Sequence, residues 1–386
     1  MSYHVRKFKV DKTETMDNLS MESGKLYSST VKFFWRTVRK KNLWLKPSSL
    51  MRLYSSDKMH AHSADASVQA FFQSLKSWRA LRKVMPEANP PSKLRDHFQV
   101  IYKNTSIRLK KGNLILSNGK NVEPLLFKDW KYEIPIQCTL RWHGKGYELI
   151  CLYSKKTLET KDQTSFLAID LGIIHTATTS DGKIYNGRLI RSMRQWKDKK
   201  TSDIQAKMDV KKKGSREWKR LRNHKIKFLN KVKNRTNDAL HKYTTGIIST
   251  CIKDGKDTLV VGDLRGYRQG NNNGKKRNQE NHAWLYSKVT WLLKYKAEKN
   301  GLNFALQNEA YSSQTCPSCK NRKKQKGRKY KCNKCGFIGH RDVVGAFNIL
   351  KMYLSDSRKW DESVVAAMRP ALKIMDVKYS PYLRVA

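Results

Sequence analysis

Four cysteines near the end of the chain have the spacing of a metal site. They form two Cys-x2-Cys pairs with twelve residues between them: Cys316, Cys319, Cys332 and Cys335. Each pair makes a tight turn that aims two sulfurs at one point, and Zn²⁺ binds four thiolates in a tetrahedron at about 2.3 Å. Because sulfur would fill all four positions, we expect a structural zinc and not a catalytic one. The alternative, four unrelated buried cysteines, is disfavoured by this spacing.

Three carboxylates in separate segments are candidates for a second metal centre. Asp170 ends an apolar run, Glu309 precedes the first cysteine pair, and Asp342 follows the second pair. Mg²⁺ prefers oxygen ligands, and two Mg²⁺ ions about 4 Å apart activate water and stabilise the leaving oxygen of a phosphodiester. Taken singly, Asp170 could instead be a turn or cap residue, Asp342 a helix N-cap and Glu309 a surface acid. The chemistry therefore depends on elements that bring three distant segments together.

The charge of the chain indicates a polyanionic partner. Its 386 residues include 80 Lys and Arg against 32 Asp and Glu, a formal net charge of +48. Such an excess favours nucleic acid, because each neutralised phosphate releases condensed counterions. The basic residues run the whole length of the chain and are not confined to one tail. The alternatives are a cationic surface without a partner, a ribosomal protein and a membrane-surface protein.

Composition also bounds the cellular setting. The apolar content of 39%, with ten Trp and seventeen Tyr, argues for folded cores. No apolar run has transmembrane length, and the first ten residues lack the apolar segment of a signal peptide. We expect an intracellular protein, in which thiols stay reduced and paired cysteines bind zinc. Cys138, Cys151 and Cys251 lie in apolar surroundings and are expected to be small buried side chains.

The first 160 residues are predicted to form a strand-rich domain interrupted by helices. Residues 3–10 alternate as a strand, residues 12–86 have helical periodicity, and the sequence EANPPS at 87–92 breaks the pattern. Short strands separated by glycine-containing turns follow over 96–155. An antiparallel barrel or sandwich is the simplest fold, with the helices inserted after its first strand.

The pattern after residue 165 is that of an α/β domain. A strand over 166–170 ends at Asp170, and two strands around a DG turn follow it. A helical region crowded with Lys and Arg extends from Leu189 to about His241. It is either a solvated helix pair or a basic wall of a nucleic-acid channel, and the net charge favours the wall. Further elements are predicted in this order: a strand at 258–261, a loop at 268–279, a helix over 285–300, a strand at 303–308 and a helix at 343–353.

Four motifs resemble the RuvC-type nuclease core of TnpB, the transposon-encoded relative of type V CRISPR effectors. In order, they are IDLG with Asp170, VVGDLRG, SSQTCPSC…CNKCG and HRDVVGAFNIL. Fanzor proteins of eukaryotes and their viruses share this core. The resemblance is specific over about 165–350 and rests on architecture alone over 1–160. It implies an α/β RNase H-like (RuvC) nuclease core with an inserted zinc ribbon, and an N-terminal β-barrel-like wedge domain that carries an inserted helical recognition domain.

The resemblance also implies a domain plan, partners and cofactors. The expected domains are a wedge (1–11 and 88–160), a recognition domain (12–87), a nuclease domain (161–311 and 339–353), a zinc ribbon (312–338) and a basic C-terminal tail (354–386). The expected partners are a guide called omega RNA and target double-stranded DNA, cleaved next to a short transposon-associated motif. The expected ions are a structural Zn²⁺ and two catalytic Mg²⁺. We expect a monomer without membrane contact, in the cytoplasm or nucleoid of a prokaryote or the nucleus of a eukaryote.

One motif departs from the family. The usual second motif carries a Glu directly before the Asp-Leu pair, and this chain has Gly262 there. In a rearranged branch of the family the strand before the zinc ribbon supplies the Glu, and Glu309 matches that position. Neighbouring strands lie about 4.8 Å apart, so a carboxylate can reach the same metal from either. The resemblance thus implies Asp170, Glu309 and Asp342 as the catalytic, Mg²⁺-binding residues.

Three alternatives remain open at this point. Asp263 is nearer in sequence to the lost Glu, but its side chain should leave the opposite face of the strand. If neither acid serves, the chain is a nuclease-dead, RNA-guided DNA-binding regulator. A basic zinc protein of the translation or transposition machinery would leave the order of the four motifs unexplained.

Overall fold

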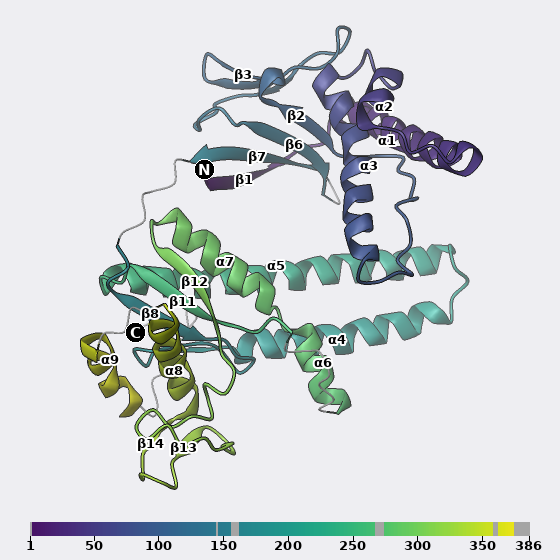
Figure 1. The fold of residues 1–386 in the computed structure, drawn as a ribbon. Helices are drawn as coiled ribbons and strands as arrows, with labels where there is room; N and C mark the ends of the chain where they lie inside the picture. Colours follow the sequence, from purple (N-terminus) through teal and green to yellow (C-terminus); the bar gives the residue numbers. More distant parts are fainter. Residues whose placement is uncertain (1, 144–145, 156–161, 267–273, 358–361, 374–386) are drawn as a thin grey trace. The chain divides into compact units, whose positions relative to one another are not determined.

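The computed structural model describes residues 2–143, 146–155, 162–266, 274–357 and 362–373 (Figure 1). The chain divides into two compact units, Met1–Lys156 and Thr157–Ala386. Among the described residues, no helix is long and apolar enough to cross a membrane. Cys138, Cys151 and Cys251 are buried, as their apolar neighbours in the sequence predict.

The unit Met1–Lys156 contains a four-stranded and a three-stranded antiparallel sheet. The first has the order β1-β7-β6-β2 and the second the order β3-β4-β5. The strands are β1 (Ser2–Val10), β2 (Val100–Lys103), β3 (Ile107–Lys110), β4 (Asn113–Leu116), β5 (Leu125–Phe127), β6 (Gln137–Trp142) and β7 (Tyr147–Lys155). Lys111 and Gly112 join β3 to β4 with φ angles of 49° and 71°, as a tight two-residue hairpin requires. The short helix η1 (Asn104–Ser106) precedes β3.

Three helices lie in the sequence between β1 and β2. They are α1 (Glu14–Lys41), α2 (Pro47–Leu53) and α3 (Ala61–Arg82). Thr13 caps α1 by accepting a hydrogen bond from the N–H of Met16, and Asn42 ends the helix in the left-handed conformation. Phe34 and Phe71 are fully buried where α1 packs against α3, with ring centroids 5.0 Å apart. These helices have their own aromatic core.

The unit Thr157–Ala386 is built on a five-stranded sheet of order β10-β9-β8-β11-β12. The strands are β8 (Phe166–Asp170), β9 (His175–Thr179), β10 (Ile184–Asn186), β11 (Thr258–Asp263) and β12 (Asn303–Asn308). β11 is parallel to both β8 and β12, whereas β9 is antiparallel to β8 and β10. The ends of β8, β11 and β12 therefore meet at one edge of the sheet.

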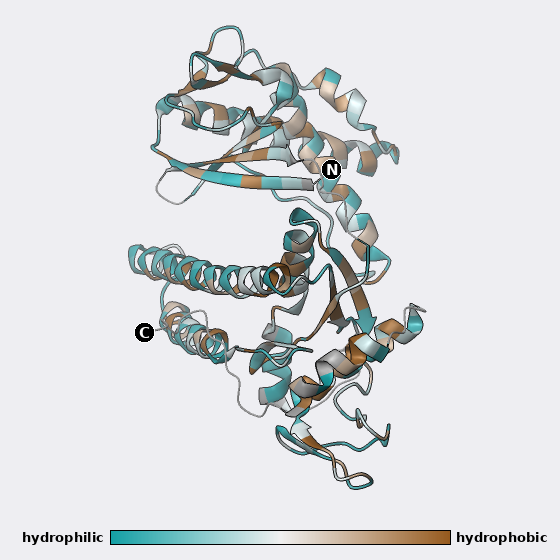
Figure 2. Cartoon of the chain, turned by 90° about the vertical axis from the view of Figure 1, so that its left-hand side faces the viewer, coloured by the Kyte–Doolittle hydropathy of each residue, from teal (hydrophilic) through white to brown (hydrophobic). Residues whose placement is uncertain are grey.

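Helices cover both faces of this sheet. On one face, α5 (Arg216–Lys253) and α7 (Tyr286–Lys299) bury Leu167 and Ile169 of β8. On the other face, α8 (Arg341–Asp356) buries Phe166 and Ala168. The alternation follows from the two-residue period of a strand. Figure 2 shows brown and teal residues interspersed along the helices, as expected of helices with one buried face.

Two helices and a hairpin also belong to this unit. The helix α4 (Arg188–Asp209) packs against α5 through Ile204, Met208, Phe228 and Val232. The helix α6 (Lys275–Ala283) occupies part of the segment expected to be a loop, whose residues 268–273 lie outside the described ranges. The hairpin of β13 (Lys329–Lys331) and β14 (Ile338–His340) precedes α8.

Part of the segment expected to be a basic tail, after residue 353, is helical. α8 continues to Asp356, and α9 (Glu362–Met368) and η2 (Arg369–Lys373) follow. Leu354, Val365 and Leu372 are buried in the same hydrophobic core as Phe347 of α8. These three apolar side chains make residues 354–357 and 362–373 part of the folded unit, and the rest of the expected tail lies outside the described residues.

Candidate active site and metal centre

The sheet brings the three predicted carboxylates into one cavity. Asp170 ends β8, Glu309 directly follows β12, and Asp342 lies in the first turn of α8. All three line a single cavity of about 430 Å³. Asp170 is four residues after Phe166 and two after Ala168, so the period of the strand turns it toward α8. Three segments that are far apart in the sequence thus meet at one edge of the sheet.

Gly262 leaves the space that the Glu309 carboxylate occupies. A Cβ atom at position 262 would lie 2.2 Å from Oε2 of Glu309 and 3.0 Å from Cδ1 of Ile349. Real Cβ atoms do not approach other heavy atoms to 2.2 Å. A second glycine has the same role for Asp170, because a Cβ at Gly345 of α8 would lie 2.6 Å from its Oδ2. Both glycines let backbone approach a buried carboxylate closely.

Asp263 is placed away from this cavity. Its carboxylate bonds to Arg265 of the same segment, with Nη2 to Oδ2 2.6 Å apart, and accepts a hydrogen bond from the Tyr286 hydroxyl of α7. α7 covers the face of the sheet opposite to α8. The side chain of Asp263 therefore leaves the opposite face of the strand from Gly262, as the strand period requires.

The environment of Asp170 and Glu309 disfavours their negative charges unless a cation binds beside them. Burial, together with the carboxylates of Glu309 and Asp342, raises the pKa of Asp170 well above its ordinary value. Burial, and to a smaller degree Asp263, raises the pKa of Glu309 to about 7. Oε2 of Glu309 is buried and has no hydrogen-bond partner among the described residues. Oxygen donors this crowded fit hard divalent cations such as Mg²⁺, whose charge would hold them ionised.

Asp342 has a different environment because basic groups surround it. Its Oδ2 accepts hydrogen bonds from Nδ1 of His175 at 2.7 Å and from Nη1 of Arg328. Burial opposes ionisation, but these two groups outweigh it and hold the pKa of Asp342 well below its ordinary value. His340 lies two residues before Asp342, at the end of β14, and is only 7% exposed. Asp342 is thus held as a carboxylate.

Sequence reasoning missed His175, His340 and Arg328 as members of the site. His340 carries a local signal, since it stands two residues before an acid at the start of a helix. His175 is separated from Asp342 by 167 residues and Arg328 by 14, and no local pattern links them to it. Their proximity depends on the tertiary fold.

α6 supplies another wall of the cavity. Arg277, Asn281 and Trp284 line it beside the carboxylates. The carboxylate of Glu280 on α6 is bound by two residues of α4: Arg191, at 2.7 Å from Nη2 to Oε1, and Gln195, at 3.2 Å from Nε2 to Oε1. A neighbouring cavity of about 510 Å³ also contacts Glu280 and is lined by basic residues, among them Arg191, Arg194 and Lys199. Basic side chains at the mouth of an acidic site favour a phosphate-bearing substrate.

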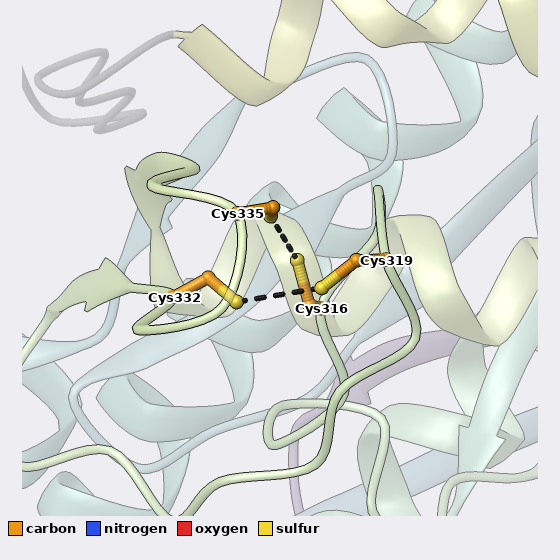
Figure 3. Close-up of side chains that lie close together, drawn as sticks. All are labelled: Cys316, Cys319, Cys332 and Cys335. Atoms are coloured by element: carbon orange, nitrogen blue, oxygen red, sulfur yellow. Dashed lines mark hydrogen bonds between the residues drawn. The ribbon is translucent and has the colours of Figure 1, made fainter.

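The four cysteines converge as their spacing predicts (Figure 3). Their sulfurs all lie within 4.8 Å of one another, and the Cys316–Cys335 and Cys319–Cys332 sulfurs are each 3.5 Å apart. A tetrahedral zinc with Zn–S bonds of about 2.3 Å has sulfurs separated by roughly 3.8 Å, so the donors fit Zn²⁺. The backbone N–H groups of Cys335 and Lys334, the first being the larger influence, lower the pKa of Cys332 to about 6. Such amides favour the thiolate that zinc requires.

Two family models match the chain. One is described as "Probable transposase" (OrfB_IS605) and matches residues 149–268, and the other is the "Cas12f1-like, TNB domain", which matches residues 286–349. Together they cover the β8–β11 region and the segment from α7 through the cysteine pairs to α8.

Curated relatives resemble the same region. The "TnpB-like protein MJ0751" of Methanocaldococcus jannaschii is 28% identical over 207 residues, which cover 51% of this chain and 72% of that protein. The "Putative RNA-guided DNA endonuclease InsQ" of Escherichia coli is 26% identical over 218 residues, which cover 54% of each chain. The chain thus spans about half the length of the second relative.

Two solved structures share the fold, and both are of type V effectors. One is Cas12f1 in a complex with sgRNA and target DNA, with a TM-score of 0.59 at 12% identity, covering 87% of this chain and 82% of that one. The other is CasPhi-2 (Cas12j) bound to crRNA and phosphorothioate-DNA, with a TM-score of 0.52 at 11% identity, covering 91% of each. Motif order, matched models and named relatives agree in one respect: over this region the chain resembles the TnpB family.

Proposed function

We propose that this protein is an RNA-guided DNA endonuclease. It would use an omega RNA as guide and cut DNA beside a short transposon-associated motif. The observation that carries the proposal is the cavity in which Asp170, Glu309 and Asp342 meet, with Gly262 making room for Glu309. A site that had only lost its glutamate would not place another buried one in the vacated space. The name of one relative, a putative RNA-guided DNA endonuclease, supports the same activity.

The three carboxylates would hold two Mg²⁺ ions, which would supply water activation and stabilisation of the leaving oxygen. Asp342 is kept ionised by His175 and Arg328, so it is ready to bind a cation. Asp170 and Glu309 have raised pKa values and would lose their protons when a cation binds. Arg277 and the basic residues on α4 would bind phosphates of the strand that enters the cavity.

We assign the domains according to the family plan. The sheets of residues 1–11 and 88–160 would form the β-barrel-like wedge, and the helices within 12–87 the recognition domain. Residues 161–311 and 339–353 would form the RNase H-like (RuvC) nuclease domain, which we extend through residue 373 because Val365 and Leu372 pack in its core. Residues 312–338 would form the zinc ribbon, with Cys316, Cys319, Cys332 and Cys335 as ligands.

The partners follow from charge and family. Guide pairing would read the target sequence, and the protein would recognise the shape of the heteroduplex and the flanking motif. The net charge of +48 supplies phosphate contacts for both a guide RNA and double-stranded DNA. We propose that the protein acts as a monomer. Its location would be that of the DNA, the nucleoid of a prokaryote or the nucleus of a eukaryote.

The deciding experiment copurifies the protein with its own flanking RNA. The complex is incubated with Mg²⁺ and a plasmid library in which the flanking motif is randomised. We expect cutting that depends on the motif and that Asp170→Ala abolishes. Motif-dependent binding without cutting would replace this proposal with the nuclease-dead regulator.

A matched pair of variants tests the assignment of Glu309. Losing a metal ligand costs several kcal/mol of transition-state stabilisation, so Glu309→Gln should slow cleavage by more than about 100-fold. Asp263→Asn, a charge-matched change on the other face of the sheet, should stay within about threefold of wild type. The reverse result would assign the missing ligand to Asp263.

A further inference from the structure

Two imidazoles lie beside Asp342, and an all-oxygen Mg²⁺ site would use neither of them as a ligand. The ligand atoms of His175, His340 and Asp342 all lie within 4.8 Å of one another. Nδ1 of His175 is 2.7 Å from Oδ2 of Asp342, and the two imidazole rings are 5.5 Å apart between centroids. The three residues form a His–His–carboxylate cluster, which is a common ligand set for transition metals.

His340 is the residue that most clearly indicates a ligand. Its side chain is 7% exposed, and within the described part of the chain nothing hydrogen-bonds to its Nδ1. A buried polar atom without a partner is destabilising, because it has given up its hydrogen bonds to water without replacing them. Its retention beside a second imidazole and a carboxylate is explained if a cation takes the position.

Rigid elements hold the three residues in place. His340 ends β14, Asp342 lies in the first turn of α8, and His175 begins β9 beside β8. The cysteine pairs and β13 fix β14 from one side, and buried Val343 and Phe347 hold α8 against the sheet. Such support maintains ligand geometry better than a loop would.

The charged groups around the cluster are compatible with a cation. Arg328 bonds to Oδ2 of Asp342, and Nε of Arg341 lies 3.7 Å from its Oδ1. The Arg328 side chain is 38% exposed, so its guanidinium can turn to solvent when a metal ion replaces it on Oδ2. Asp170 and Glu309 line the same cavity and offset the positive charge.

We propose that His175, His340 and Asp342 bind a divalent transition-metal ion of the Mn²⁺ class. Imidazole nitrogen suits transition-metal ions such as Fe²⁺ and Zn²⁺, whereas an all-oxygen site suits Mg²⁺. Mn²⁺ accepts both oxygen and nitrogen ligands, so it can use this mixed set and be detected there. The consequence of this metal binding for DNA cleavage rests on the proposed function, because the cluster shares Asp342 with the proposed nuclease site. Metal binding by the cluster does not depend on cleavage.

The test is electron paramagnetic resonance of the full chain titrated with Mn²⁺, after zinc beyond one equivalent per chain has been removed. Loss of the free-ion signal measures affinity, and electron spin-echo modulation reports ¹⁴N bound directly to Mn²⁺. We expect ¹⁴N modulation that persists in excess Mg²⁺. Removing one ligand should weaken this binding at least about tenfold in His175→Asn and His340→Asn. His224→Asn, an exposed histidine on α5, is the control and should bind as wild type does.

Several outcomes would overturn the inference. Mn²⁺ bound without ¹⁴N modulation would place the ion on oxygens only, and wild-type Mn²⁺ affinity in both histidine variants would place it elsewhere. The wild-type spectrum remains informative even if a variant does not fold. A chain that shows ¹⁴N modulation but never cleaves DNA would keep this inference and refute the proposed function. Cleavage without ¹⁴N modulation would keep the proposed function and refute this inference.

Discussion

Gly262 and Glu309 are complementary in space: a Cβ on Gly262 would lie 2.2 Å from Oε2 of Glu309. Gly262 lies on β11, and β12 is the neighbouring parallel strand. Glu309 directly follows β12, where Asn308 pairs with Asp263. Only one of the positions 262 and 309 can direct a side chain into this space.

The Gly262→Ala variant tests this relationship. The added methyl group must displace the Glu309 carboxylate, so we expect Mg²⁺-supported cleavage to fall by at least about tenfold, equivalent to roughly 1.4 kcal/mol. The strand itself should tolerate alanine, because its backbone is regular. The measurement is the single-turnover rate on a matched target.

A double-mutant cycle gives the control for Gly262→Ala. In a Glu309→Ala background the carboxylate is absent, so adding Gly262→Ala should change metal affinity and unfolding free energy little further. Equal effects of Gly262→Ala in both backgrounds would mean that the methyl group acts on the strand or on Ile349, and not through Glu309.

The cysteine cluster predicts one tightly bound zinc per chain. Cys332→Ser should abolish stoichiometric zinc and unfold the β13–β14 hairpin, because structural zinc supplies most of the folding energy of such modules. Metal analysis and limited proteolysis measure these effects. Cys251→Ala, a buried cysteine of α5 outside the cluster, should retain the metal. Substantially less than one zinc in the wild-type chain would contradict the assignment.

The hydrogen bonds of the Asp257 carboxylate, next to the first residues of β8 and β11, predict that part of the folding stability depends on pH. Its Oδ2 accepts hydrogen bonds from the N–H groups of Thr164 and Ser165, at 2.9 and 2.8 Å, and its Oδ1 accepts one from the hydroxyl of Thr258. Burial opposes ionisation, but hydrogen bonds from Thr258 and Thr164 outweigh it and lower the pKa of Asp257. Because the folded pKa is the lower one, this stability is present above about pH 3.9 and is lost as the pH falls through the folded pKa.

Urea unfolding of Asp257→Asn measures this contribution. At pH 7 we expect a loss of about 1–3 kcal/mol, since the amide cannot accept all of these bonds. The difference from wild type should shrink at pH 3. Asp238→Asn, an exposed acid that pairs with Lys242 on α5, should cost less than about 1 kcal/mol at either pH. A loss for Asp257→Asn that is the same at both pH values would rule out an electrostatic origin.

Local pattern was sufficient for most elements of the second unit. The apolar run that ends at Asp170 predicts β8, and Leu285, Val289, Leu292 and Leu293 predict α7, because buried faces impose a period on the sequence. The period of β11 also predicts that Asp263 and Gly262 face opposite sides. Pattern therefore predicted which acids could meet.

Long-range contacts could not be predicted in this way. The segment of α6 is polar and has no apolar period, so a loop was predicted, but Arg191 and Gln195 of α4 hold Glu280 and a helix forms. His175 and Arg328 reach Asp342 only through the fold. Tertiary contacts of this kind override local propensity and have no signal in a single sequence.

The basic face of α5 predicts the salt dependence of DNA binding. Lys227, Lys231 and Arg235 are exposed and spaced by four residues, so they form one stripe along the helix. If each contacts a phosphate, replacing all three with alanine should reduce the slope of log K against log salt by about 2.7, at roughly 0.9 per contact. The measurement is non-specific duplex binding between low and physiological salt. Exchanging Lys and Arg at the three positions keeps the charge and should keep the slope. Equal slopes for the alanine and the charge-preserving variants would show that DNA does not follow this face.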